Sequence, residues 1–182
     1  MIEISFLFEQ CLVVAAWLLF RGAAYLKNRT FSWKREAVQL LFLINLLVIC
    51  RFTFHPFSKV DGQVQPLIFD IATAWPFRMN LVPFVNLTDY EAKNEMVLNI
   101  VGNFTMFIPT GIISRLIYKS LNSFKKTALT GFMISLVIEI IQLPFAVRAS
   151  DVDDLILNTA GCLAGYGILM LIRTIKRKAV KV

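Results

Sequence analysis

Five apolar segments, separated by short charged or polar runs, dominate the pattern of this sequence. They cover roughly residues 4–26, 37–54, 96–118, 127–147 and 154–173. A transmembrane helix needs about 20 mostly apolar residues at 1.5 Å of rise per residue, and each segment comes close to that length. The pattern therefore predicts an all-α, polytopic membrane helix bundle with about five transmembrane helices, forming a single domain over residues 1–182.

The connection between the second and third segments, about residues 55–95, is too long for a simple turn. It carries large apolar side chains, including Trp75, Phe77, Leu81 and Phe84. Loops of this length in compact domains are usually functional or disordered, and this composition is not that of a disordered segment. We expect the connection to fold back onto the bundle or to dip into the membrane interface, with a plain surface tether as the alternative.

Composition agrees with membrane residence. The chain is 57% hydrophobic and 17% charged, with a mean hydropathy of +0.66, whereas soluble domains are about 25% charged. A net charge of +7 would also suit a nucleic-acid-binding protein. However, the basic residues border apolar segments and form no aromatic-interleaved patch, so we predict no nucleic-acid partner. The N-terminus lacks the basic region and cleavage site of a removable signal peptide, so the first segment is expected to remain.

Basic residues predict the orientation of the chain. Fourteen of the 19 Lys and Arg residues lie in three regions: between the first and second segments, between the third and fourth, and after the fifth. Of the 12 acidic residues, only Glu36 falls in these regions. Because Lys and Arg concentrate on the cytoplasmic side of membrane proteins, the N-terminus is predicted outside and the C-terminus in the cytoplasm. The long connection is then extracytoplasmic.

Cysteine and glycine residues inside the apolar segments are predicted to serve packing. Cys11, Cys50 and Cys162 show no metal-ligand spacing, and we interpret all three as small buried hydrophobes. Three glycines would give the fifth segment a small face for close helix contact: Gly161, Gly165 and Gly167. Neither a nucleophile–base motif nor a glycine-rich phosphate loop is present, and we predict no metal and no cofactor.

Polar side chains recur at helical spacing in the last three segments. An ionisable or amide side chain inside a membrane is costly and normally faces the bundle interior or a water-filled cavity. Capping of a helix N-terminus would explain one of the acids that open the fifth segment, but not the whole set. The sets at spacings of three or four are Asn99 with Asn103, Glu139 with Gln142, and Asp151 with Asp154 and Asn158.

Further polar residues fall at the same outer level in the predicted topology. They are Arg51, His55, Arg78, Asn80 and Arg148. Arginines in a cleft would suit a phosphate or a carboxylate, which the planar guanidinium recognises through paired donors. The acids could instead form an acid and base pair if burial separated their pKa values. A structural alternative is a set of buried pairs that specify helix register.

Four motifs in order carry a family resemblance. They are Arg78–Phe84 (RMNLVPF), Asn99–Gly111 with its NIVGN and FIPTG ends, Glu139–Gln142 (EIIQ), and Arg148–Gly161 with its RASDVDD and NTAG ends. Over about residues 78–167 the chain thereby resembles the VanZ-like proteins, whose namesake is associated with teicoplanin resistance. The resemblance implies a protein of the bacterial cytoplasmic membrane that reduces susceptibility to teicoplanin-type glycopeptide or lipoglycopeptide antibiotics.

Our leading hypothesis is an outer polar cleft that binds an anionic envelope lipid or a lipid-linked cell-wall intermediate. Its candidate ligands are Arg78, Asn80, Asn99, Asn103, Glu139, Gln142, Arg148, Asp151, Asp154 and Asn158, to which the predicted topology adds Arg51 and His55. The alternative is a membrane-embedded hydrolase or transferase acting on a lipid-linked phosphate, with Glu139, Asp151 or Asp154 as catalytic candidates. A transporter is less favoured, because five spans without inverted repeats do not fit that architecture.

Overall fold

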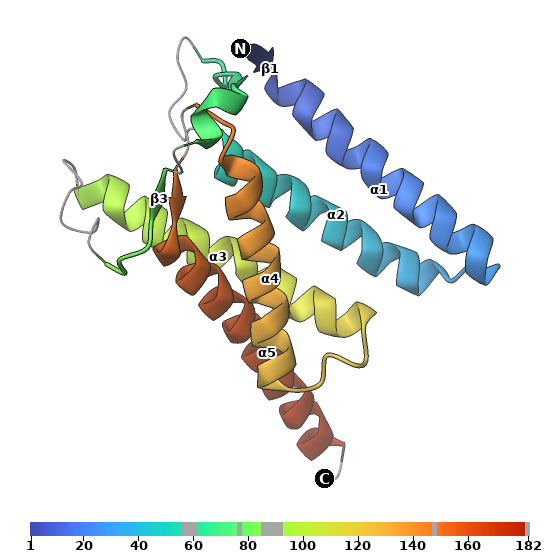
Figure 1. The fold of residues 1–182 in the computed structure, drawn as a ribbon. Coiled ribbons are helices and arrows are strands. Elements are labelled where there is room, and N and C mark those ends of the chain that lie inside the picture. The colour runs from blue at the N-terminus through green and yellow to red at the C-terminus, as the bar shows by residue number, and fades with distance from the viewer. Residues whose placement is uncertain (56–61, 76–77, 85–92, 147–148, 181–182) are drawn as a thin grey trace. The chain divides into compact units, whose positions relative to one another are not determined.

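The computed structural model of the chain describes residues 1–55, 62–75, 78–84, 93–146 and 149–180, and helices make up most of it (Figure 1). The helices are α1 (Phe6–Asn28), α2 (Trp33–Phe54), α3 (Lys93–Ile117), α4 (Phe124–Gln142) and α5 (Val152–Ala179). The shorter elements are β1 (Ile2–Ile4), β2 (Leu67–Phe69), the 3-10 turn η1 (Ile71–Ala74), β3 (Met79–Asn80) and β4 (Ser150–Asp151). The predicted all-α class is confirmed.

Four helices are long and apolar enough to cross a membrane: α1, α2, residues Met96–Ile117 of α3, and α5. The remaining helix, α4, has 19 residues and includes Lys125, Lys126 and Glu139, so it is the least apolar of the predicted spans. The protein is therefore a multi-pass membrane helix bundle, with a span count close to the five predicted.

The end of α4 differs from the sequence prediction. The fourth segment was expected to remain helical to residue 147, but the helix ends at Gln142. Beyond that point the backbone pairs with the long connection instead: the N–H of Asp70 donates to the carbonyl of Pro144 (2.8 Å), and the N–H of Ala146 donates to that of Ile68 (2.9 Å). Proline supports the change, because its ring has no backbone donor with which to continue a helix.

The chain divides into two compact units. Unit 1 comprises Met1–Asn80 and Ile138–Ser150, and unit 2 comprises Leu81–Val137 and Asp151–Val182. Unit 1 therefore holds α1, α2, the first part of the long connection and the last turn of α4. Unit 2 holds α3, most of α4, and α5.

Unit 1 is closed by the long connection folding back onto the helices. Strand β2 pairs antiparallel with β1, with Ile4 opposite Leu67. Leu67 also enters a buried core with Cys50, Phe54 and Phe145, in which the Phe54 and Phe145 ring centroids lie 5.7 Å apart. The expectation that the connection folds back is confirmed for its described part.

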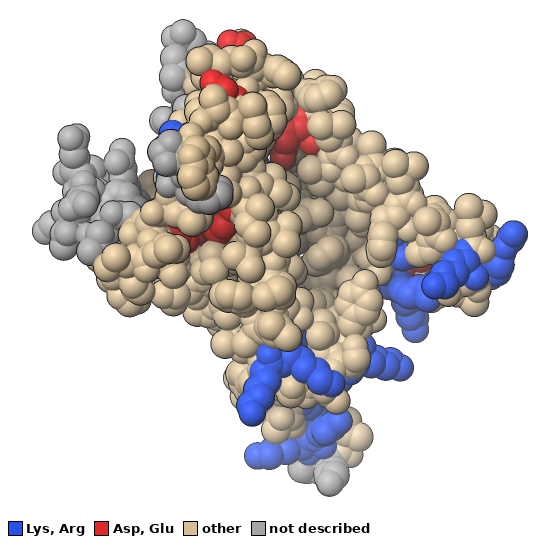
Figure 2. Space-filling model, in the orientation of Figure 1, with Lys and Arg blue, Asp and Glu red and all other residues tan. Residues whose placement is uncertain are grey.

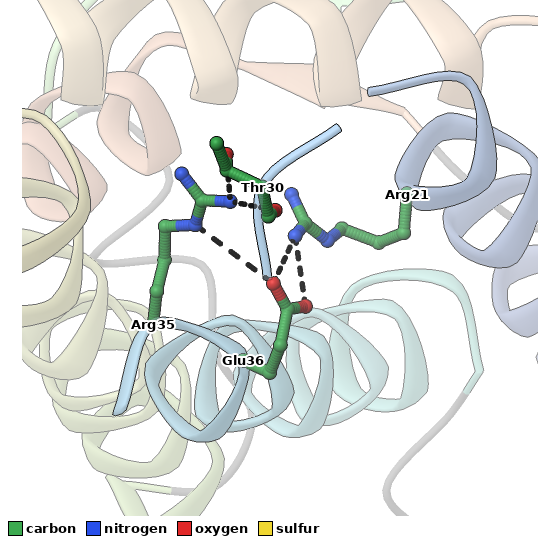
Figure 3. Close-up of polar contacts among 4 residues, drawn as sticks. All are labelled: Arg21, Thr30, Arg35 and Glu36. Atoms are coloured by element: carbon green, nitrogen blue, oxygen red, sulfur yellow. Dashed lines mark hydrogen bonds and ion pairs between the residues drawn. The ribbon is translucent and has the colours of Figure 1, made fainter. Parts of the chain in front are cut away.

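In unit 1, α1 and α2 run antiparallel side by side (Figure 1), yet no residue of α1 is buried. An ion pair joins the two helices near their turn: the Arg21 Nη2 atom lies 2.6 Å and 2.8 Å from the two carboxylate oxygens of Glu36. Arg35 approaches the same carboxylate at 3.8 Å and donates to the carbonyl of Thr30 (Figure 3). Side-chain exposure is 15% for Arg21 and 23% for Glu36, so this pair is largely shielded.

Replacing Glu36 with Gln is expected to lower the free energy of unfolding by about 2 kcal/mol, because it leaves the shielded guanidinium of Arg21 without its counter-charge. Arg35→Gln is the matched control. Arg35 is 44% exposed, and exposed pairs contribute only about 0–1 kcal/mol. Thermal unfolding in detergent measures both variants, and equal shifts in their midpoints would contradict the assignment of the main contact to Arg21.

Unit 2 is organised by close packing of α3 against α5, which lie side by side (Figure 1). A Cβ added to Gly161 would overlap the Phe104 carbonyl oxygen, one on Gly165 would overlap that of Ile108, and one on Gly111 would overlap that of Cys162. Only glycine allows backbones to approach this closely. The predicted packing role is confirmed for Gly161 and Gly165, but it is wrong for Gly167, whose Cβ would meet no atom within 4 Å.

The cysteine prediction is also corrected at one position. Cys50 and Cys162 are buried as expected, whereas Cys11 is exposed. The reason is that Cys11 lies in α1, a helix whose side chains are not buried by the protein. All three are free thiols.

Charge is unevenly placed within each unit. Lys and Arg side chains gather at the α1–α2 turn in unit 1, and at the α3–α4 turn and the end of α5 in unit 2 (Figure 2). Acids open α5, with Asp153 and Asp154 in its first turn and Lys176, Arg177 and Lys178 in its last. This arrangement complements the helix macrodipole at both ends.

Candidate functional site

A row of polar side chains follows the contact between α3 and α5 in unit 2. The Asn103 side-chain amide donates to the Asn99 Oδ1 atom at 2.7 Å and also to an Asp154 carboxylate oxygen. One amide nitrogen carries two hydrogens, so it can serve both acceptors. The predicted shared face of Asn99 and Asn103 is thus present, and the structure adds Asp154 as their neighbour from the facing helix.

The row continues deeper into unit 2 through Asn158, one helical turn beyond Asp154. Its Nδ2 atom donates to the Ser135 hydroxyl of α4 at 2.9 Å, and both side chains are buried, at 2% and 0% exposure. The Asn158 Oδ1 atom is buried and accepts no hydrogen bond from the described residues. An unsatisfied buried acceptor is uncommon in folded proteins and indicates space for a donor that the protein does not supply. We call Asn99, Asn103, Asp154, Asn158 and Ser135 the polar row.

The acids beside the row have structural tasks. Asp151 is the N-cap of α5, and its carboxylate accepts from the Asp153 N–H at 2.9 Å. Both oxygens of Asp153, which is 7% exposed, lie within hydrogen-bond distance of the Phe84 N–H, at 2.9 Å and 3.1 Å. Phe84 has a left-handed backbone, with φ of 64°. Asp153 therefore fixes the end of the first sequence motif against the start of α5.

The polar residues of unit 1 bind mainly backbone. The two terminal nitrogens of Arg78 donate to the carbonyls of Ala146 (2.6 Å) and Phe145 (3.0 Å), which follow the end of α4. The Arg78 carbonyl in turn accepts from the N–H of Ser150 at 2.9 Å. Paired donation from a planar guanidinium is the chemistry expected of Arg78, but in this structure it secures the chain leaving α4.

Glu139 and Gln142 lie on the last turn of α4 in unit 1, each 4% exposed. The Gln142 side-chain amide donates to the Thr53 carbonyl near the end of α2, at 2.9 Å. The carbonyl of Glu139 accepts from the buried Ser150 hydroxyl at 2.7 Å. These contacts fasten the end of α4 to α2 and to the segment that leads into α5.

His55 and Arg51 join the end of α2 to α1. His55 is fully buried, with Nδ1 3.0 Å from the Gln65 carbonyl oxygen and Nε2 3.7 Å from a carboxylate oxygen of Glu9. Because a carbonyl only accepts, Nδ1 carries the proton in that contact. Arg51 donates to the His55 carbonyl at 3.3 Å and lies over the Phe6 ring, 5.7 Å from its centroid.

The predicted site residues thus fall into two sets. Asn99, Asn103, Asp154 and Asn158 lie along one row in unit 2, with Asp151 beside it. Arg51, His55, Arg78, Asn80, Glu139 and Gln142 belong to unit 1, where Asn80 forms part of β3 and is half-buried. Arg148 lies outside the described residues. The described residues contain no group of three or more His, Cys, Asp or Glu side chains able to hold a metal ion.

Two partners in these sets were not anticipated from the sequence. Ser135 receives the hydrogen bond of Asn158, and Ser150 binds the Glu139 carbonyl. A signal for Ser135 was available, because it precedes Glu139 by four residues and so lies on the same face of α4. Ser150 stands next to the predicted Asp151, but nothing in its spacing indicates a partner on α4.

Comparison with known proteins connects this geometry to a family. The sequence pattern of the VanZ/LLP1 family matches residues 42–173, well over half of the chain. The chain belongs to the VanZ/LLP1 family. This match begins within α2, so it takes in Arg51 and His55, which the motifs of residues 78–167 had left out.

A relative within the VanZ/LLP1 family is Protein VanZ of Enterococcus faecium, which is 34% identical over 93 residues. That alignment covers 50% of this chain and 53% of the relative, so the chain spans about half the length of the curated protein it matches. No solved structure matches this VanZ/LLP1 protein.

Proposed function

We propose that this VanZ-like protein reduces bacterial susceptibility to teicoplanin-type glycopeptide or lipoglycopeptide antibiotics by binding a lipid-linked cell-wall intermediate at the polar row. The observation that carries the proposal is the row itself: polar side chains within apolar helices, ending at the buried, unsatisfied Oδ1 of Asn158. Polar groups at membrane depth are costly and mark functional sites by default. The family and the enterococcal relative support the link to resistance.

The proposal includes an orientation in which the start of α5 faces outward. Its support is the placement of Lys and Arg, which cluster at the α1–α2 turn, at the α3–α4 turn and after α5 (Figure 2). In unit 2 the polar row lies toward the start of α5, away from these cationic ends. A ligand would then reach it from the extracytoplasmic leaflet, where glycopeptides act.

The chemistry of the row favours one ligand class over another. Three amides, one hydroxyl and one carboxylate accept and donate hydrogen bonds, which suits the sugar hydroxyls and peptide amides of a cell-wall intermediate. A phosphate would need Arg or Lys nearby, and the carboxylate of Asp154 would repel it. Among the side chains described in unit 2, the cations lie at the opposite ends of the helices. A simple anionic lipid is therefore the second choice.

Expression of the full chain in a susceptible Gram-positive host tests this function. We expect the minimal inhibitory concentration of teicoplanin to rise several-fold over a strain with empty vector, with little change for vancomycin. Tagged protein in the membrane fraction confirms insertion. An unchanged teicoplanin concentration at good expression would contradict the proposal.

A further inference from the structure

The end of α5 carries a shallow groove that the proposed function does not use. Its volume is about 580 Å³, and its walls are formed by Thr174, Lys176, Arg177, Lys178 and Val180. Lysine and arginine side chains have long methylene stems, so such a groove has apolar walls beneath a cationic rim. This combination fits an amphipathic anion.

The length of α5 places the groove at a defined depth. From Val152, where the helix begins, Thr174 lies about 33 Å along the axis at 1.5 Å per residue. The hydrocarbon core of a bilayer is about 30 Å thick. The groove therefore falls among the lipid head groups of the leaflet in which α5 ends.

The cations around the groove have no acidic partner in the protein. Within the described residues, Arg173, Lys176, Arg177 and Lys178 take part in none of the ion pairs, all of which lie in unit 1. The acids of α5 stand in its first turn, at the far end of the helix. Exposed Ile175, at 57%, adds an apolar contact between these cations.

We propose that this groove binds an acidic phospholipid of the surrounding membrane. The phosphate contacts Arg177 and the two lysines, while the first methylenes of an acyl chain lie along the lysine stems and Val180. Basic clusters directly beside a transmembrane helix attract anionic lipids strongly, and guanidinium binds phosphate through paired donors. Membrane orientation alone would explain an excess of Lys and Arg, but not a groove that they line.

The test uses the purified full chain in detergent, titrated with phosphatidylglycerol or phosphatidylcholine and analysed by native mass spectrometry. One variant combines Lys176→Gln, Arg177→Gln and Lys178→Gln. The matched control combines Lys27→Gln, Arg29→Gln and Lys34→Gln, which removes the same charge from exposed positions at the α1–α2 turn. We expect at least about tenfold weaker phosphatidylglycerol binding in the groove variant, and less than about a twofold change in the control.

A second variant, Val180→Asp, keeps all four cations but places a negative charge in the groove, and it should weaken phosphatidylglycerol binding as well. Phosphatidylcholine should bind wild type and both groove variants alike. Unchanged phosphatidylglycerol binding in the groove variants would overturn the proposal. Equal losses in the groove variant and the control would also overturn it, because total charge would then account for the effect.

Discussion

Replacing Gly165 with Val is expected to prevent stable assembly of unit 2, lowering the free energy of unfolding by roughly 3 kcal/mol or more. The added Cβ would overlap the Ile108 carbonyl oxygen and would lie 2.9 Å from its carbon and 3.2 Å from the Ile108 Cα. All of these are backbone atoms of α3, so no side-chain rotation can relieve the clash. Size-exclusion chromatography and thermal unfolding in detergent measure the outcome.

Gly167→Val provides the matched control for this variant. It stands two residues further along α5, and a Cβ there would meet no atom within 4 Å. Glycine is among the least favourable residues inside a helix, so valine at this position should leave stability unchanged or raise it slightly. Similar unfolding temperatures for the two variants would show that α3 and α5 do not approach as closely as the structure indicates.

Replacing Asp154 with Ala is expected to return the teicoplanin susceptibility of an expressing strain to that of empty vector. The change removes the acceptor to which Asn103 donates and leaves a half-buried amide without that partner. It also deletes the only carboxylate of the polar row. Asp154→Asn keeps the size and one acceptor oxygen without the charge, so partial protection in that variant would assign the effect to hydrogen bonding rather than charge.

Loss of stability must be separated from loss of the site. Glu36→Gln is the appropriate control, because it is expected to destabilise the protein by a comparable amount while its contacts all lie in unit 1. The amount of each variant in the membrane fraction is measured alongside susceptibility. Full protection by Asp154→Ala at wild-type levels would exclude Asp154 from the function.

The sequence predicted the helices well because apolar length governs membrane insertion regardless of tertiary partners. Their ends were less predictable. The fourth helix stops at Gln142 because Pro144 and Ala146 pair with the region of β2, far away in sequence. Likewise, α1 extends to Asn28, where Arg29 adopts a left-handed conformation with φ of 52° and donates to the Tyr25 carbonyl. Apolar periodicity contains no information about such contacts.

The candidate site shows the same division. Helical spacing was sufficient to place Asn99 and Asn103 on one face, because that relation is local. Arg78 illustrates what spacing cannot reveal. Its residue type indicated anion binding, yet its donors bind two carbonyls beyond α4, which lie 67 and 68 residues away in the chain. The need of those carbonyls for donors arises only once α4 has ended.

The most direct measurement is the affinity of the purified chain for a lipid-linked cell-wall intermediate, compared between wild type and Asn103→Ala. Asn103 is the residue that joins Asn99 to Asp154. The proposal predicts saturable, stoichiometric binding, recovery of the intermediate unchanged, and binding about tenfold weaker in the variant, equivalent to the loss of one or two hydrogen bonds. Equal affinity in the two proteins, or conversion of the intermediate into a product, would contradict it.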